Sequence, residues 1–168
     1  MTINKVFAGI LAATCLSVAA TPALAQRTDV HVAGQGRLLK ERTFSVNVFV
    51  NADGSATGMA QLVRRDFPTD TPDKNTPIIE KMTVTCGNRV DANTVVFGGV
   101  IDRSNNTALS ETRYFAVRDN GNPGAGNDEM TFSVPSTLGA GDPLFCLNLP
   151  ATAFQFETIE TGNIKTQG

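Results

Sequence analysis

Polar and apolar side chains alternate along Thr43–Val50, with one exception at Phe49. A period of two residues is typical of a strand that is buried on one face only. The next residues, Asn51–Ser55, contain an Asp-Gly pair. This pair favours a hairpin turn because both residues tolerate positive φ. The sequence therefore predicts a β-hairpin whose return strand covers Ala56–Arg65.

Other short segments rich in β-branched or aromatic residues predict further strands. They are residues 31–39, Ile78–Cys86, Thr94–Ile101, Glu111–Arg118, Glu129–Val134, Leu144–Leu149 and Ala153–Ile159. Gly, Asn and Asp residues stand between most of them, where turns need such residues. None of the segments has apolar residues at helical spacing with caps at both ends. We therefore expect one all-β domain, a single antiparallel β-sandwich or partly closed β-barrel of about 8 strands.

One insertion interrupts this regular spacing. Residues 66–77 contain three prolines and few apolar side chains, which predicts an exposed Pro-rich loop. Asp66, Asp70 and Asp73 in this loop are candidates for contact with a ligand or partner.

The first 25 residues have a different pattern. Lys5 is followed by the almost entirely apolar or small run Val6–Ala20, and Ala23–Ala25 forms an A-x-A site. This is the pattern of a secretory signal peptide, so we expect residues 1–25 to be removed after Ala25. The mature domain, residues 26–168, would then be secreted or periplasmic. No later segment reaches the roughly 20 apolar residues of a spanning helix, so we expect no membrane span after signal removal.

Three cysteines occur in the chain, and Cys15 lies in the predicted signal peptide. The remaining pair, Cys86 and Cys146, predicts a disulfide in an oxidising compartment. A loop of this length would contribute on the order of 4 kcal/mol in the chain-entropy model.

The charge pattern excludes several kinds of function. The mature chain has 13 Lys and Arg against 16 Asp and Glu, a net charge of −3, and the charges are scattered. A nucleic-acid interface needs a basic patch, so none is expected.

Catalytic and metal-binding residues are also scarce. His31 is the only histidine, and no nucleophile motif accompanies it, so we expect a solvated side chain on an early strand. Zinc sites need three or four Cys or His ligands, which this chain cannot supply, so no zinc site is expected. Carboxylate pairs are available, but the chain has no Trp and one Tyr for stacking on a sugar. We therefore expect no catalytic residues and no enzyme activity.

Several segments together resemble a known family. They are Val84–Cys86, Asn93–Gly99, Val117–Asp128, Thr131–Val134 and Gly162–Ile164. Over about residues 34–166 the chain resembles the post-COAP type domain, a small all-β module of exported bacterial proteins, usually without an assigned function. The D-N-G-x-P-G-x-G-x-D loop is the most specific part of this likeness. The resemblance implies the same fold class and an exported protein, and it brings no catalytic residues.

The chain departs from the family pattern at two places. Asn127 precedes the closing acid and Glu129-Met130 follow it, and the insertion at 66–77 is longer than in the family. The first departure puts in doubt the register between the loop and the following strand.

The loop Asp119–Asp128 has two interpretations. Calcium takes oxygen ligands from carboxylates, Asn side chains and backbone carbonyls; the candidates here are Asp119, Asn120, Asn122, Asn127 and Asp128. The spacing is not that of an EF-hand. The alternative is a plain turn, in which Asp119 and Asn120 make Asx-turn bonds, Gly121 takes positive φ and Pro123 fixes a second turn. The plain turn is favoured; calcium is the one cofactor that the sequence leaves open.

These observations favour an exported, non-catalytic binding or structural module whose loops meet a protein or glycan partner. One alternative is a β-barrel that carries a small lipophilic ligand among inward aromatic side chains. The candidates for that lining are Phe44, Phe97, Phe115, Phe132, Phe154 and Phe156. A second, less favoured alternative is a small carboxylate-based hydrolase. The sequence sets no oligomeric state.

Overall fold

The computed structural model describes residues 28–39, 41–65, 77–105, 112–121, 124–131, 134–135 and 143–168. Nine strands lie within these residues: β1 (Val30–Leu38), β2 (Arg42–Val50), β3 (Ala56–Arg64), β4 (Ile78–Arg89), β5 (Thr94–Ser104), β6 (Thr112–Arg118), β7 (Glu129–Thr131), β8 (Val134–Pro135) and β9 (Phe156–Gln167). A short helix, α1 (Pro143–Asn148), and a 3-10 turn, η2 (Ala151–Ala153), precede β9.

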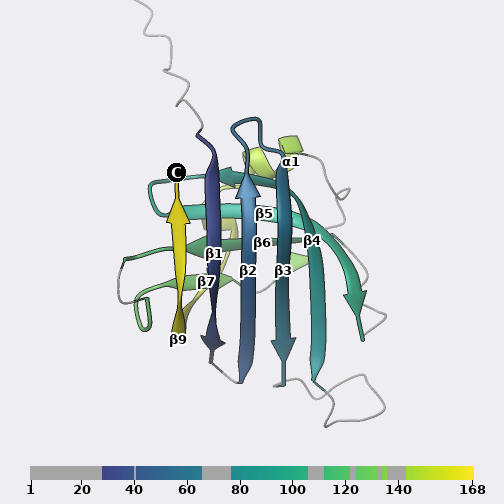
Figure 1. Ribbon diagram of the computed structural model, residues 1–168, viewed down its shortest axis with the longest axis vertical. Helices are drawn as coiled ribbons and strands as arrows, with labels where there is room; N and C mark the ends of the chain where they lie inside the picture. The colour runs from purple at the N-terminus through teal and green to yellow at the C-terminus, as the bar shows by residue number, and fades with distance from the viewer. Residues whose placement is uncertain are drawn as a thin grey trace, which may run out of the picture.

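Eight of these strands close into an antiparallel barrel. The order is β5-β4-β3-β2-β1-β9-β7-β6, and the ring closes because β6 also pairs with β5. Strand β8 continues beyond β7 along the same edge of β6. Figure 1 shows β9, β1, β2, β3 and β4 upright in one layer, with β5, β6 and β7 crossing behind them. The prediction of an all-β fold with about eight strands is confirmed.

The predicted hairpin joins β2 to β3. Gly54 has φ of +89°, and its N–H donates to Asn51 O at 2.9 Å. A Cβ atom at this position would lie 2.6 Å from the Leu147 side chain of α1. Gly54 is therefore needed both for the turn and for the close approach of the helix.

The barrel interior is filled by alternate residues of the strands. On β2, Phe44, Val46, Val48 and Val50 are buried, whereas the residues between them are more exposed. Phe97 of β5 stacks on Phe115 of β6 inside the barrel, with ring centroids 5.5 Å apart. These side chains belong to one hydrophobic cluster to which all the long strands contribute.

Strands β5 and β6 are buried on both faces. Val96, Tyr114 and Ala116 point away from the interior and form a second cluster with Cys86, Cys146 and Phe154. The segment that contains α1 and η2 covers this outer face.

The prediction of a strand at Leu144–Leu149 is wrong, because this segment is helix α1. The prediction at Ala153–Ile159 is right only from Phe156, where β9 begins. An apolar run of six residues does not distinguish a strand from a short helix by its period. Here the contact with the outer face of β5 and β6 decides the conformation.

The predicted signal peptide, residues 1–25, lies outside the described residues. Among the residues that are described, neither helical segment has the length and apolar character of a membrane crossing.

Candidate functional site

The loop Asp119–Asp128 follows β6, and its two acids accept hydrogen bonds from the backbone. Asp128 is fully buried, and its Oδ1 and Oδ2 accept hydrogen bonds from Asn120 N at 2.9 Å and Ile164 N at 2.8 Å. Asp119 Oδ1 accepts from Gly121 N at 3.0 Å, and its Oδ2 accepts from Thr166 N at 2.8 Å. Each carboxylate therefore makes one hydrogen bond within the loop and one to the backbone of β9.

The turn interpretation agrees with this geometry. The bond from Gly121 N to Asp119 is the Asx-turn that the sequence predicts, and Gly121 has φ of +99°. Asn120 Oδ1 accepts from Asn93 Nδ2 at 2.7 Å, and its Nδ2 donates to Asn127 O at 2.7 Å. Within the described residues, no three His, Cys, Asp or Glu side chains gather as a metal site would require. Calcium binding remains an untested prediction.

Other predicted site residues lie outside the described residues. They are Asn122 and the loop acids Asp66, Asp70 and Asp73.

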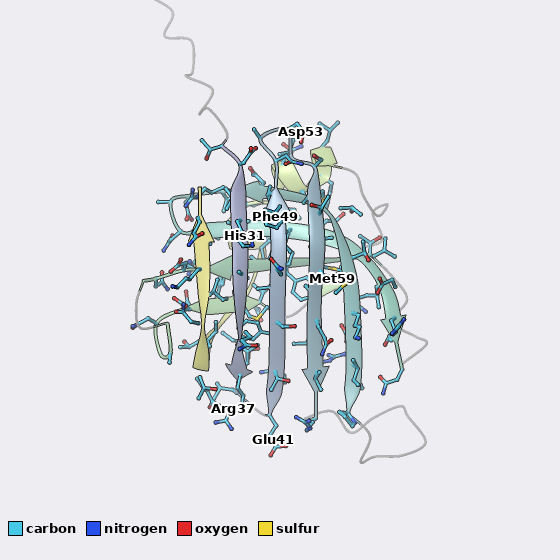
Figure 2. The ribbon with its side chains drawn as sticks, in the orientation of Figure 1. His31, Arg37, Glu41, Phe49, Asp53 and Met59 are labelled. Atoms are coloured by element: carbon cyan, nitrogen blue, oxygen red, sulfur yellow. A yellow bond between two sulfur atoms is a disulfide. The ribbon has the colours of Figure 1, made fainter. Side chains whose placement is uncertain are left out.

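His31 is on β1, as expected, and its ring stacks on the exposed Phe49 with centroids 4.1 Å apart. Figure 2 shows the two side chains next to each other on the outer face of β1 and β2. The Nε2 atom of His31 lies 2.8 Å from Asn47 Oδ1. The imidazole is thus part of an outward cross-strand pair.

The β2–β3 turn and α1 lie at the same end of the barrel (Figure 1). A groove lies between residues of this end. Its volume is about 430 Å³, and we call it the end groove. It is lined by Thr28, Val50, Asn51, Gly87, Asn88, Arg89, Val90, Asp91, Ala92 and Leu147. The β4–β5 hairpin supplies one wall, and the helix supplies Leu147.

The polar groups of the end groove are held in place by hydrogen bonds. Asn88 Nδ2 donates to Leu147 O at 3.1 Å, which links β4 to α1. Arg89 donates from Nη1 to Gly168 O and from Nη2 to Ala92 O, each at 2.8 Å. These contacts give the groove a fixed polar rim beside the apolar Val50, Val90 and Leu147.

Asp91 is the acid of this rim. Its Oδ1 accepts from Asn93 N at 3.0 Å and from Thr94 N at 2.7 Å. Burial acts to raise the pKa of Asp91, but these hydrogen bonds and the charge of Arg118 outweigh it, so the pKa lies below its usual value. Asp91 is therefore a carboxylate that orders the β4–β5 hairpin.

The predicted cysteine pair meets beside the end groove. Cys86 and Cys146 lie at disulfide distance, with their Cα atoms 5.8 Å apart. Cys86 directly precedes Gly87, and Cys146 directly precedes Leu147, so both neighbours of the pair line the groove. The link holds α1 against the end of β4.

The end groove is not predicted by the sequence pattern. The sequence pattern predicts Gly87-Asn88 and Asp91-Ala92 only as turns between strands, and it predicts a strand where α1 lies. The available signal was the cysteine pair, since a covalent link requires the residues beside Cys86 and Cys146 to be neighbours.

Comparison with known proteins found no matching family model, no matching curated protein and no matching solved structure. The likeness to the post-COAP type domain therefore stays a prediction.

Proposed function

We propose that the chain is an exported, non-catalytic binding module, and that the end groove receives the ligand. The observation that carries the proposal is the groove itself, which has about 430 Å³ of space beside a hydrogen-bonded polar rim. Ligand sites in proteins are typically concave, with an apolar lining and a few fixed polar groups. The ligand would have an apolar body for Val90 and Leu147 and a hydrogen-bonding edge for Asn51 and Asn88. A side chain of a protein partner or part of a glycan has this chemistry.

The state of the acids supports binding over catalysis. A hydrolytic carboxylate pair needs two acids that face a substrate, one of them with a raised pKa. Asp91, Asp119 and Asp128 instead accept hydrogen bonds from backbone N–H groups. Glu80, Glu129 and Glu157 each pair with an arginine.

The filled interior gives less support to a carrier of lipophilic molecules. Phe44, Phe97 and Phe115 point inward as that hypothesis requires, but they pack in one cluster with the aliphatic residues. Phe154 and Phe156 pack with the outer cluster, and Phe132 lies outside the described residues.

Export completes the proposal, since a disulfide persists in an oxidising compartment. It agrees with the signal pattern of residues 1–25.

The test is a ligand screen by thermal melting of the purified chain, with amino acids, short peptides, monosaccharides and disaccharides as probes. Two variants of α1 accompany the wild type: Leu147→Lys inside the end groove and Leu144→Lys outside it. Leu144 is 65% exposed, so its substitution is the matched control. We expect one class of probe to raise the midpoint of the wild type and Leu144→Lys, but not of Leu147→Lys. The proposal would be overturned if a probe stabilised Leu147→Lys as much as the wild type. It would also be overturned if no probe raised the midpoint of the wild type.

A further inference from the structure

Asn88 of the end groove is a nearly buried side chain with an unused acceptor. It is 9% exposed and lines the groove. Its Nδ2 donates to Leu147 O at 3.1 Å. Because a carbonyl oxygen only accepts hydrogen bonds, this contact fixes the amide with its nitrogen toward α1. Within the described residues no donor binds the other end of the amide, Oδ1, and this atom is not enclosed by protein. The oxygen is therefore available to a ligand.

Asn51, at the β2–β3 turn, has the same arrangement. Its Nδ2 donates to Ser55 Oγ at 2.9 Å, and Ser55 Oγ donates to Asp53 Oδ1 at 2.6 Å. A hydroxyl has a single hydrogen, so Ser55 Oγ can only accept from Asn51, which fixes the orientation of this amide as well. No donor in the described part of the chain binds Asn51 Oδ1. The end groove thus has a second amide oxygen without a partner.

The donors of the end groove, by contrast, already bind protein oxygens. Arg89 donates from Nη1 and Nη2 to two backbone carbonyls, and its Nε is buried where a ligand does not reach it. The N–H groups of Gly87 and Val90 also donate to backbone carbonyls, each at 3.0 Å. The lining therefore offers a ligand mainly acceptors.

Asp91 adds a negative charge to these acceptors. The two backbone N–H groups that bind it, Asn93 N and Thr94 N, both reach Oδ1. An ionised carboxylate has about four lone-pair sites on its two oxygens, so it can accept further hydrogen bonds. The lowered pKa of Asp91 keeps the group ionised at neutral pH. Among the described residues no ion pair includes Asp91, so its charge is available to a cation.

We propose that the ligand of the end groove carries a protonated primary amine of a peptide, either its N-terminus or a lysine side chain. This inference rests on the proposed function and specifies its ligand. An ammonium group has three N–H donors and no acceptor, which matches the acceptors of Asn51, Asn88 and Asp91. Val90 and Leu147 would contact the hydrocarbon that carries the amine. They favour a peptide over an amino sugar, whose ring carries hydroxyl groups.

The first test compares three probes that share a butyl chain: butylamine, 1-butanol and butyrate at pH 7. Binding is followed by the backbone amide signals of the purified chain in ¹⁵N–¹H spectra, and those of Asn88 and Asp91 should shift. We expect the dissociation constant of butylamine to be at least about tenfold lower than those of the alcohol and the acid, since hydrogen bonds to charged groups are the stronger ones. Leucinamide and Nα-acetyl-lysinamide then distinguish an N-terminal amine from a lysine side chain, and glucosamine tests the sugar.

The second test removes the charge of Asp91. Asp91→Asn should weaken the binding of butylamine about tenfold and leave that of 1-butanol unchanged. The matched control is Asp53→Asn. Asp53 accepts from Ser55 N in the β2–β3 turn, much as Asp91 accepts in its own turn, but it does not line the end groove. Equal weakening in both variants would overturn the proposal, because net charge and not the groove would then be responsible.

The other outcomes separate this inference from the proposed function. If 1-butanol or butyrate binds as tightly as butylamine, and Leu147→Lys abolishes that binding, the groove is a ligand site that does not select amines, and only this inference falls. If no amine binds, this inference falls, and the proposed function falls with it only when the wider ligand screen is negative as well. Binding of glucosamine without binding of either peptide amine would overturn the peptide assignment.

Discussion

Asp128 Oδ2 accepts a hydrogen bond from the backbone N–H of Ile164 at 2.8 Å, and both residues are fully buried. The other oxygen accepts from Asn120 N. Asp128→Ala would leave both N–H groups unsatisfied, at a cost of about 1–3 kcal/mol each. We expect the free energy of unfolding, measured with urea, to fall by about 3 kcal/mol.

The control for this prediction is Asp102→Ala. The Asp102 carboxylate accepts from Thr83 Oγ1 on an exposed part of β5, so its loss should change stability by less than about 0.5 kcal/mol. Equal losses in the two variants would mean that the buried bonds of Asp128 are not what stabilises the loop.

The same geometry predicts the response to calcium. Because Asp119 and Asp128 already accept backbone hydrogen bonds, we expect the wild type to melt at the same temperature in EDTA and in millimolar Ca²⁺. A rise of about 4 °C in Ca²⁺, absent in Asp119→Ala, would contradict this and make the loop an ion site.

Reduction of the cysteine pair should destabilise the barrel and release α1. A cross-link that spans 60 residues contributes about 4 kcal/mol in the chain-entropy model. We expect a reductant to lower the wild-type melting midpoint, and the Cys86→Ser/Cys146→Ser double variant to melt at that lower temperature in either condition. If the reductant lowers the midpoint of the double variant as well, its effect does not come from this bond.

Asp91 predicts a dependence of stability on pH. Its folded pKa lies below the ordinary value of 3.8, so the ionised group stabilises the fold above that value. This contribution is lost as pH falls through the lowered folded pKa. We expect the wild type to be more stable to urea than Asp91→Asn at pH 6, and the difference to shrink below about pH 4. Parallel profiles for the two proteins would be the contrary result.

The local features of the fold could be predicted from the sequence. The β2–β3 hairpin follows from the alternation in Thr43–Val50 and from Asp53-Gly54, since both signals act within a few residues. The strand ends at Val50 and the return at Ala56 agree with the structure. The Cys86–Cys146 pair could also be predicted, because only these two cysteines remain after the predicted signal peptide.

The long-range features could not be predicted. The closure of the ring depends on β1 pairing with β9, the first and last strands in the chain, and no local pattern encodes that pairing. An arginine in a strand is expected on the exposed face, because arginine is seldom buried, yet Arg113 is buried. Arg113 instead shares the inward face of β6 with Phe115 and Val117.

The candidate site residues also have a local part that the sequence predicts and a long-range part that it does not. Asp119 and Asp128 were found because a cluster of Asp, Asn and Gly is conspicuous, but their partners on β9 lie 47 and 36 positions further along the chain. The end groove combines β2, the β4–β5 hairpin and α1, so it exists only after the barrel has closed.

Strands β1 and β9 lie side by side, with His31 opposite Gln167, so the first and last strands emerge at the same end of the barrel (Figure 1). A force that separates these two ends would load the hydrogen bonds between them one pair at a time, starting at His31 and Gln167. The strands should therefore separate one hydrogen-bonded pair after another, at low force, until the load reaches the covalent ring of residues 86–146 that the cysteine pair closes. Residues inside that ring would not extend while the cross-link is intact, which limits how far the domain can be stretched.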